Sequence, residues 1–328
     1  MTDLLRVEGL TTHIFSDTGT VRAVEDVTLR VAPGEAVALV GESGCGKSMT
    51  ALSLLRLLRP PARILDGRVA FKGRDLLALS EKDMRRVRGG EIAMVFQDPM
   101  TFLNPLMRVG EQIAEAVEVH FDTGRAAARD RAREVLELLR IPSPGTVADH
   151  YPHQLSGGMR QRVILGMAIA CSPDLIVADE PTTALDVTIQ AQIMSLLTHV
   201  RRELGSALIL ITHDLGLVAQ YCDRVYVMYA GQIVEEADVV GLFDCPQHPY
   251  TRALLRSALS ARRPVVRFEP IEGQPPSLVQ PPSGCRFHPR CVEAEARCRS
   301  DSPERFTVGH GRWARCWLHE PRAAAGNT

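Results

Sequence analysis

The sequence predicts an α/β fold built around a mostly parallel sheet. Short apolar segments with the character of strands, at 35–41, 174–179 and 207–213, alternate with longer segments of helical periodicity. This alternation is typical of parallel sheets, because the crossover between two parallel strands is usually a helix. A glycine-rich loop of the kind that binds phosphates joins the first of these strands to a helix.

The individual elements follow from local patterns along the chain. Strands are expected at 5–10, 24–31, 35–41, 174–179, 207–213, 224–231 and 232–237. Helices are expected at 47–58, 110–120, 125–141 and 186–205. The region from about 106 to 172 is therefore mostly helical. Residues 261–284 contain six prolines and read as an extended linker, which separates the α/β part from a cysteine-bearing tail.

The composition is that of an ordinary globular protein. Hydrophobic residues make up 45% of the 328 residues, and the formal net charge of −1 does not indicate a nucleic-acid partner. The N-terminus lacks the basic and apolar regions of a signal peptide, and no apolar run reaches the roughly 18 residues of a membrane span. We therefore expect a cytosolic chain, whose eight cysteines are not disulfides by default.

The glycine-rich loop matches the pattern G-x-x-x-x-G-K-[ST]. Its residues are Gly41, Glu42, Ser43, Gly44, Cys45, Gly46, Lys47 and Ser48, with Met49 next along the predicted helix. Glycines let backbone N–H groups approach a phosphate closely, and the helix N-terminus adds a fixed positive end. Lys47 is expected to reach the β- and γ-phosphates, and the Ser48 hydroxyl to ligate Mg²⁺. The alternative is a glycine-rich turn before a helix without a ligand.

Two carboxylates end the next buried strand. Asp179 is expected to hold Mg²⁺ at the sheet edge, and Glu180 to polarise the attacking water. Either residue alone could instead cap a helix.

A second anion site is expected at Leu155, Ser156, Gly157, Gly158 and Met159. Ser156 and the two glycines place a hydroxyl and bare backbone amides at the start of a helix. One nucleotide rarely needs two such sites, so this one is expected to serve a nucleotide held by another subunit. The alternative, a helix capped by Ser156, uses the same geometry.

These motifs, in this order, resemble the ATP-binding subunits of ABC transporters. LSGGM at 155–159 matches the ABC signature, Gln97 the Q-loop glutamine, Ala184–Asp186 the D-loop, and His213 the switch histidine. The resemblance implies a P-loop NTPase fold of the ABC ATPase type, with antiparallel β and helical subdomains. The cassette would span 1–258, with its helical subdomain at about 106–172, followed by the linker at 259–284 and the tail at 285–328.

The resemblance also implies roles for individual residues. Two cassettes would form a head-to-tail dimer, with ATP between the P-loop of one and the signature of the other. Glu180 would be the catalytic base, His213 would hold the γ-phosphate, and Gln97 would sense Mg²⁺. Most such cassettes stack the adenine on an aromatic residue near the N-terminus. Thr18 falls near that position here, and Phe15 is the nearest aromatic candidate.

Several stretches are similar to one subgroup, the oligopeptide, dipeptide and nickel importer ATPases. They are 96–105, 158–194, 248–259 and the cysteine tail, and the chain looks like the D-type subunit. This likeness implies a second ATPase subunit, two integral membrane permeases and an extracytoplasmic solute-binding protein, with the chain peripheral on the cytoplasmic side of the cell membrane. Phe102 departs from the serine expected at its position.

The alternatives are an importer of nickel or another small solute, an exporter cassette, and a soluble ABC ATPase. A P-loop kinase or GTPase would leave the signature unexplained.

Four of the eight cysteines, Cys285, Cys291, Cys298 and Cys316, lie in the tail. Four thiolates can hold a zinc ion or a [4Fe–4S] cluster, and the spacing is wider than the C-x2-4-C pairs of structural zinc. The subgroup resemblance implies a [4Fe–4S] cluster. Zinc, disulfides and unligated thiols remain alternatives. We expect any bound group to stabilise a tail that has few apolar residues.

Overall fold

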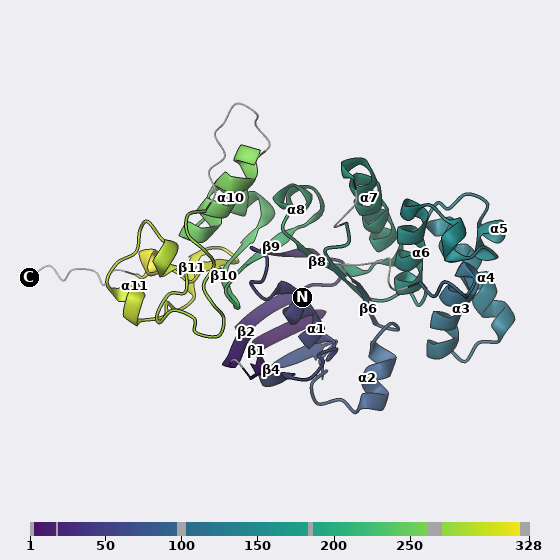
Figure 1. Ribbon diagram of the computed structural model, residues 1–328, viewed down its shortest axis with the longest axis horizontal. Helices are drawn as coiled ribbons and strands as arrows, with labels where there is room; N and C mark the ends of the chain where they lie inside the picture. Colours follow the sequence, from purple (N-terminus) through teal and green to yellow (C-terminus); the bar gives the residue numbers. More distant parts are fainter. Residues whose placement is uncertain (1–2, 18, 97–102, 183–185, 262–270, 322–328) are drawn as a thin grey trace, which may run out of the picture. The chain divides into compact units, whose positions relative to one another are not determined.

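A computed structural model describes residues 3–17, 19–96, 103–182, 186–261 and 271–321 of the chain (Figure 1). The chain divides into two compact units, each made of several segments. The first comprises 1–5, 31–36 and 71–211, and the second comprises 6–30, 37–70 and 212–328. Gln97, Phe102, Ala184 and Thr18, which were singled out in the sequence, lie outside the described residues. Among the described helices, none has both the length and the apolar character of a membrane span.

The first unit contains three parallel strands and most of the helices that the sequence predicts between 106 and 205. Its elements are β5 (Arg74–Asp75), α2 (Glu81–Val87), β6 (Ile92–Val95), α3 (Val109–His120), α4 (Arg125–Leu138), α5 (Pro144–Ala148), η2 (Pro152–Gln154), α6 (Gly157–Ile169), β7 (Leu175–Asp179), α7 (Val187–Leu204) and β8 (Ala207–Thr212). The strands run in the order β6-β7-β8.

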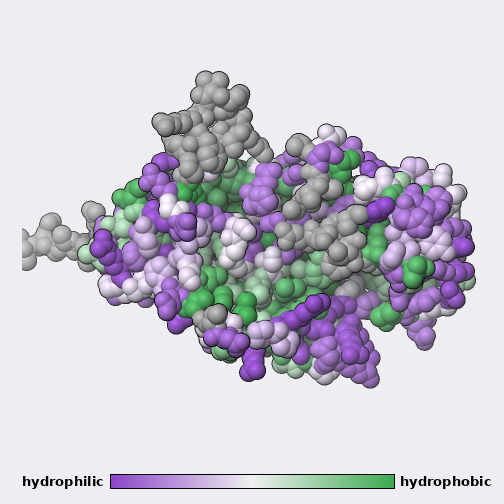
Figure 2. Space-filling view, in the orientation of Figure 1, coloured by the Kyte–Doolittle hydropathy of each residue, from purple (hydrophilic) through white to green (hydrophobic). Residues whose placement is uncertain are grey.

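Helices α3, α4, α5 and α6 pack against one another as a helical layer (Figure 1). On α4, the buried residues Ala128, Ala132, Val135 and Leu136 recur at the three-to-four spacing of one helix face. The helical region that the sequence predicts is therefore a packed bundle of amphipathic helices. Helix α2 is charged along most of its length, and Figure 2 shows a strongly hydrophilic surface over it.

The second unit contains the N-terminal strands, the glycine-rich loop and the tail. Its elements are β1 (Leu5–Ser16), β2 (Gly19–Val31), β3 (Ala36–Val40), α1 (Lys47–Leu54), β4 (Ala62–Phe71), α8 (Leu215–Tyr221), β9 (Arg224–Tyr229), β10 (Gln232–Asp238), α9 (Val239–Asp244), α10 (Pro249–Ala261), η3 (His288–Arg290), α11 (Arg297–Ser300), β11 (Phe306–Gly309), β12 (Arg312–Ala314) and η4 (Trp317–His319).

Two sheets organise this unit. The strands β2, β1 and β4 are neighbours in one sheet, in the order β2-β1-β4. The other has the order β11-β12-β10-β9-β3, in which β3 and β9 are parallel and the remaining pairs are antiparallel. The prediction of a mostly parallel sheet therefore describes β3, β9 and the three strands of the first unit, whereas the tail side is antiparallel.

The tail is integrated into the second unit. Strand β12 pairs with β10, with Glu235 opposite Ala314 and Glu236 opposite Trp313. Phe287 is only 3% exposed and belongs to the same hydrophobic core as Val227, Tyr229 and Tyr250. The sequence did not predict β11, β12 or β4, and it predicted a tail with little apolar material of its own. The tail instead shares the core of the cassette.

Candidate nucleotide site and cysteine pocket

The glycine-rich loop lies between β3 and α1, as the sequence predicts. All five residues of β3 are buried, so the strand fixes the start of the loop within the sheet. Helix α1 begins at Lys47, and its N-cap residue, Gly46, has no side chain to cap the first N–H groups. The phosphate cradle expected from the sequence would be formed by these N–H groups and the positive end of the helix.

Glycine is required at two positions of this loop. Gly41 has φ +157° and Gly46 has φ +112°. A Cβ at Gly41 would collide with the carbonyl oxygen of Met228, and one at Gly46 with the carbonyl oxygen of Ala23. The loop therefore packs directly against the backbone of the second unit, and side chains at these positions would displace it.

Lys47 braces the loop from inside. It is only 5% exposed, and its Nζ donates hydrogen bonds to the carbonyl oxygens of Gly41 (2.8 Å) and Glu42 (3.0 Å). The third donor of the ammonium group lies 3.9 Å from the Cys45 sulfur, a weak acceptor that a phosphate oxygen could replace. Cys45 is buried beside it, and burial raises the pKa of the Cys45 thiol. Cys45 therefore fills space in the loop as a neutral thiol.

The two carboxylates of the first unit lie at the end of β7, whose residues are all buried. Asp179 is 5% exposed. Glu180 has φ +45°, which is uncommon for a residue with a side chain, and its N–H donates to the Ile211 carbonyl oxygen at 2.9 Å. Left-handed strain of this kind is concentrated at functional sites, where the surrounding structure holds it. Neither residue caps a helix within the described elements, so the capping alternative receives no support.

The segment 155–159 begins helix α6. Leu155 is buried, Ser156 and Gly157 are exposed, and the Ser156 hydroxyl accepts a hydrogen bond from the Met159 N–H at 3.3 Å. A Cβ on Gly157 would meet nothing within 4 Å. Ser156 is therefore the helix cap, as the alternative interpretation proposed, and the space beside Gly157 is open.

His213 and Asp186 both lie at element ends. His213 is exposed and directly follows β8, so it is not the buried structural histidine that a lone histidine after an apolar strand would suggest. Asp186 caps α7, because its Oδ1 accepts from the Ile189 N–H at 2.9 Å. Both are placed where a partner or ligand could contact them.

Phe15 lies near the end of β1 with 42% of its surface exposed. The guanidinium of Arg63 lies 5.9 Å from the centroid of its ring. An exposed ring on a strand is compatible with base stacking.

The structure adds residues that the sequence did not single out. The Glu42 N–H donates to the Tyr250 hydroxyl at 2.9 Å, and Arg290 forms an ion pair with the Glu42 carboxylate at 2.7 Å. Tyr250 begins α10 and Arg290 belongs to the tail, so both are more than 200 residues from the loop. No local pattern indicates such contacts.

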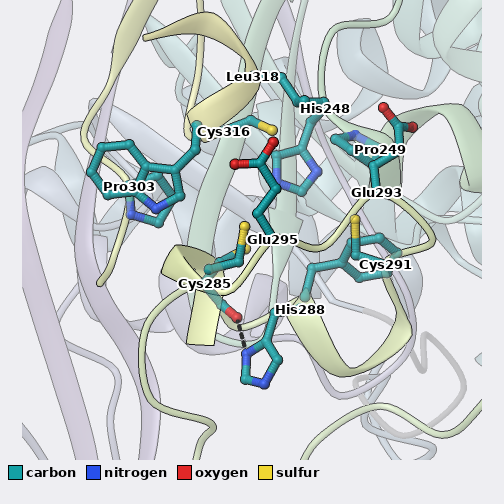
Figure 3. A pocket seen from close by; sticks show the side chains of 13 residues that line it. His248, Pro249, Cys285, His288, Cys291, Glu293, Glu295, Pro303, Cys316 and Leu318 are labelled. Atoms are coloured by element: carbon teal, nitrogen blue, oxygen red, sulfur yellow. Dashed lines mark hydrogen bonds between the residues drawn. The ribbon is translucent and has the colours of Figure 1, made fainter. Parts of the chain in front are cut away.

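The four tail cysteines line a single pocket (Figure 3). All eight cysteines of the chain are described, and none of them forms a disulfide. Burial, with a smaller contribution from the neighbouring thiols, raises the pKa of Cys285 to about 11 and that of Cys316 to about 12. The four thiols are thus close enough to interact. His288 instead hydrogen-bonds through Nδ1 to the carbonyl oxygen of Cys285 at 2.9 Å.

The pocket is not a preformed single-ion site. Within the described ranges, no three or more His, Cys, Asp or Glu side chains are arranged to hold one metal ion. Glu293 and Glu295 also line the pocket, together with the apolar Phe287, Trp317 and Leu318. The tetrahedral arrangement around one point that the zinc alternative requires is therefore not present among these described cysteines.

Two protein families each match a part of this chain. Residues 24–183 match the family described as ABC transporter. Residues 234–298 match the family described as oligopeptide/dipeptide transporter, C-terminal region.

Individual proteins are similar over nearly the whole length. A probable peptide ABC transporter ATP-binding protein, y4tR of Sinorhizobium fredii, is 52% identical over 96% of this chain and 94% of its own. The dipeptide transport ATP-binding proteins DppD are 47% identical in Bacillus subtilis, over 98% of this chain and 97% of theirs, and 46% identical in Escherichia coli, over 98% of each.

Solved structures are similar over the cassette. The dimeric, post-hydrolysis ATP-binding cassette MJ0796 bound to ADP and Pi is 27% identical, with a TM-score of 0.63, over 72% of this chain and 98% of its own. The cbiO1 subunit of the Clostridium perfringens transporter complex cbiONQ is 28% identical, with a TM-score of 0.64, over 74% of this chain and 91% of its own.

Proposed function

Since the chain belongs to the family of ATP-binding subunits of peptide ABC transporters, we propose that it hydrolyses ATP to power the import of di- or oligopeptides across the cell membrane. The observation that carries this proposal is the full-length similarity to dipeptide transport ATP-binding proteins, which includes the tail. The phosphate loop, the carboxylate pair and the signature segment supply the parts that ATP hydrolysis needs.

The chain acts with a second ATPase cassette. Ser156 and Gly157 of the signature segment are exposed, and the segment lacks a lysine like Lys47, which supports a role in covering a nucleotide bound to the partner. In return, the partner's signature would cover the nucleotide on Gly41–Ser48. The D-loop residue Asp186 would lie at the same interface.

Different residues of this chain would have different roles in ATP hydrolysis. Lys47 and the loop amides bind the β- and γ-phosphates and stabilise the charge that develops on them. Glu180 accepts a proton from the attacking water, and His213 orients the γ-phosphate. Mg²⁺ supplies charge neutralisation when bound. The oxygen ligands Ser48, Asp179 and Gln97 suit this hard cation.

The remaining partners are two permeases, which carry the membrane spans, and an extracytoplasmic solute-binding protein. The subunit would be peripheral on the cytoplasmic face of the membrane. Three apolar side chains at or near the ends of α3, Leu106 (85%), Val119 (74%) and Phe121 (46%), are exposed and support contact of the helical layer with other subunits.

Reconstitution tests the function. The chain should co-purify with a second cassette and two permeases, and peptide-loaded binding protein should stimulate ATP hydrolysis. Glu180→Gln should lower hydrolysis at least a hundredfold, roughly the contribution of a general base, while ATP binding persists. Stimulation by nickel and not by peptides would contradict the peptide assignment, and unchanged hydrolysis would contradict the role of Glu180.

The tail is proposed to hold a [4Fe–4S] cluster through Cys285, Cys291, Cys298 and Cys316. The shared pocket and the free thiols support this. A cubane takes one thiolate at each iron, so its ligands stand farther apart than those of a single ion. The cluster would cross-link four short tail segments.

Anaerobic purification tests the cluster. We expect absorbance near ~400 nm, typical of thiolate-ligated iron–sulfur clusters, and about four irons per chain. The Cys298→Ser variant should lose both signals. A colourless protein loaded with zinc would contradict the proposal.

A further inference from the structure

Arg290 connects the cysteine tail to the phosphate-binding loop. Its guanidinium makes two hydrogen bonds with the Glu42 carboxylate, Nη1 to Oε2 at 2.7 Å and Nη2 to Oε1 at 3.1 Å. The Arg290 side chain is only 4% exposed and that of Glu42 is 24% exposed. This is a bidentate, charge-assisted pair in a mostly water-excluded place, the geometry in which such pairs are strongest.

Glu42 is held from three directions. Besides the Arg290 pair, its N–H donates to the Tyr250 hydroxyl at 2.9 Å and its carbonyl oxygen accepts from Lys47 Nζ at 3.0 Å. Helix α10, the tail and the loop lysine therefore all fix one residue. Since Glu42 directly follows Gly41, its position sets the course of the loop that carries the phosphate-binding amides.

Arg290 is itself preorganised. Its Nε donates to the Glu272 carbonyl oxygen (2.9 Å), and its Nη2 to that of Ile271 (3.2 Å). Phe287, three residues earlier, packs edge-on against Tyr229 with ring centroids 5.2 Å apart. These contacts hold the Arg290 guanidinium in the position from which it pairs with Glu42.

The charge on Glu42 matters for nucleotide binding. A carboxylate within a phosphate-binding loop would repel the triphosphate at close range, where the dielectric screening of water is reduced. The Arg290 cation neutralises it at hydrogen-bond distance.

We propose that Arg290 and Tyr250 are positioning residues for ATP binding: they hold Glu42 so that the loop amides stay aimed at the phosphates, and Arg290 cancels the carboxylate charge. The tail is then part of the nucleotide site of its own subunit. This inference goes beyond the proposed transport function and requires neither a particular transported solute nor the cluster.

The test measures the MgATP dissociation constant of the full-length chain. Arg290→Gln should weaken binding about tenfold, the effect expected when one strong charge-assisted pair is lost. The double variant Glu42→Gln/Arg290→Gln should recover to within about threefold of the unmodified chain, because no unpaired carboxylate is left. Arg290→Lys should lie in between. Unchanged binding in Arg290→Gln, or a double variant as weak as the single one, would overturn the proposal.

Two further variants separate positioning from folding. Tyr250→Phe keeps the buried ring and removes only the hydroxyl, and it should weaken MgATP binding about threefold, as for loss of one neutral hydrogen bond. Arg305→Gln is the matched control. Arg305 also ties the tail to the unit, through the Thr28 hydroxyl (2.9 Å) and Asp26, yet contacts no loop residue.

Arg305→Gln should therefore lower the thermal midpoint and leave the dissociation constant unchanged. Equal loss of binding in Arg305→Gln and Arg290→Gln would mean that general tail loosening is the cause and would overturn the proposal. All these variants keep the four cysteines, so their iron content reports the cluster independently.

Discussion

Two helix N-termini of this chain have the geometry that binds phosphates, and they are built differently. At the start of α1, the loop has a buried lysine and no side-chain cap. At the start of α6, Ser156 caps the helix, both Ser156 and Gly157 are exposed, and a Cβ on Gly157 would meet open space. The start of α1 is stabilised by contacts within its own unit, whereas the start of α6 is exposed.

The difference indicates which nucleotide each site serves. A site that binds the triphosphate of its own subunit needs fixed donors and a fixed cation, because preorganised groups lose little freedom on binding. A site that closes over a partner's nucleotide must remain accessible until the partner arrives. Lys47 and Ser156 fit these two roles respectively.

The largest expected effect comes from separating the two roles by mutation. Ser156→Arg fills an exposed position, so the chain should fold and bind MgATP as before. In the assembled transporter, hydrolysis should fall about a hundredfold, as for removal of a preorganised donor. Lys47→Ala is the counterpart and should abolish binding in the isolated chain. If Ser156→Arg weakened MgATP binding by the isolated chain, the signature segment would serve the chain's own nucleotide.

Alanine substitution of one glycine at each helix N-terminus tests the difference in packing through the free energy of unfolding. Gly46→Ala should cost about 3 kcal/mol, because the new Cβ meets the Ala23 carbonyl oxygen at a backbone angle that disfavours alanine. Gly157→Ala should change stability by less than about 0.5 kcal/mol, since nothing lies within 4 Å. Denaturant unfolding of both variants measures the contrast. Equal costs would show that the two loops are equally packed.

The smallest predicted effect is a pH dependence of the unfolding free energy, which arises from His248 beside Tyr250. His248 is buried, its Nδ1 accepts the Tyr250 N–H at 3.0 Å, and burial lowers the pKa of His248 to about 3. As the pH falls below the ordinary histidine pKa of about 6.5, the unfolded chain takes up a proton first, so the folded state loses stability. The loss between pH 7.5 and 5.5 should be about 1.4 kcal/mol.

His248→Asn is the matched variant, because it offers an acceptor without titrating near these pH values. The pH-dependent part of the unfolding free energy should shrink by that amount in the variant. An identical pH dependence in both proteins would show that His248 titrates normally in the folded state.

Local patterns predicted the strand and helix ends on which most of the candidate nucleotide-site residues lie. The loop from Gly41 to Ser48, the end of β7 and the start of α6 each depend on a strand or helix boundary that a few neighbouring residues define. The amphipathic helices α3 and α4 follow from their own periodicity in the same way. Glu180 was expected from its position after an apolar strand, although its left-handed backbone was not.

The tail could not be predicted in this way. Its strand β12 is only three residues long and pairs with β10, which lies about 80 residues earlier. The pairs Arg290–Glu42 and Phe287–Tyr229 depend on tertiary packing, so no window of the sequence contains both partners. Counting the apolar residues of the tail also underestimated its core, because part of that core comes from α10 and β9.

Arg290 and Glu42 are separated by 248 positions, with the loop near the beginning of the chain and its support near the end. During translation, the segment 1–258 therefore emerges with its complete set of nucleotide-binding motifs but without Phe287 or Arg290. If domains fold as they leave the ribosome, the loop forms early and acquires its final bracing only when the last part of the chain is released. With the proposed role of Arg290, full ATP affinity then arises only once the tail is in place, and a chain that ends before Arg290 should bind MgATP about tenfold more weakly.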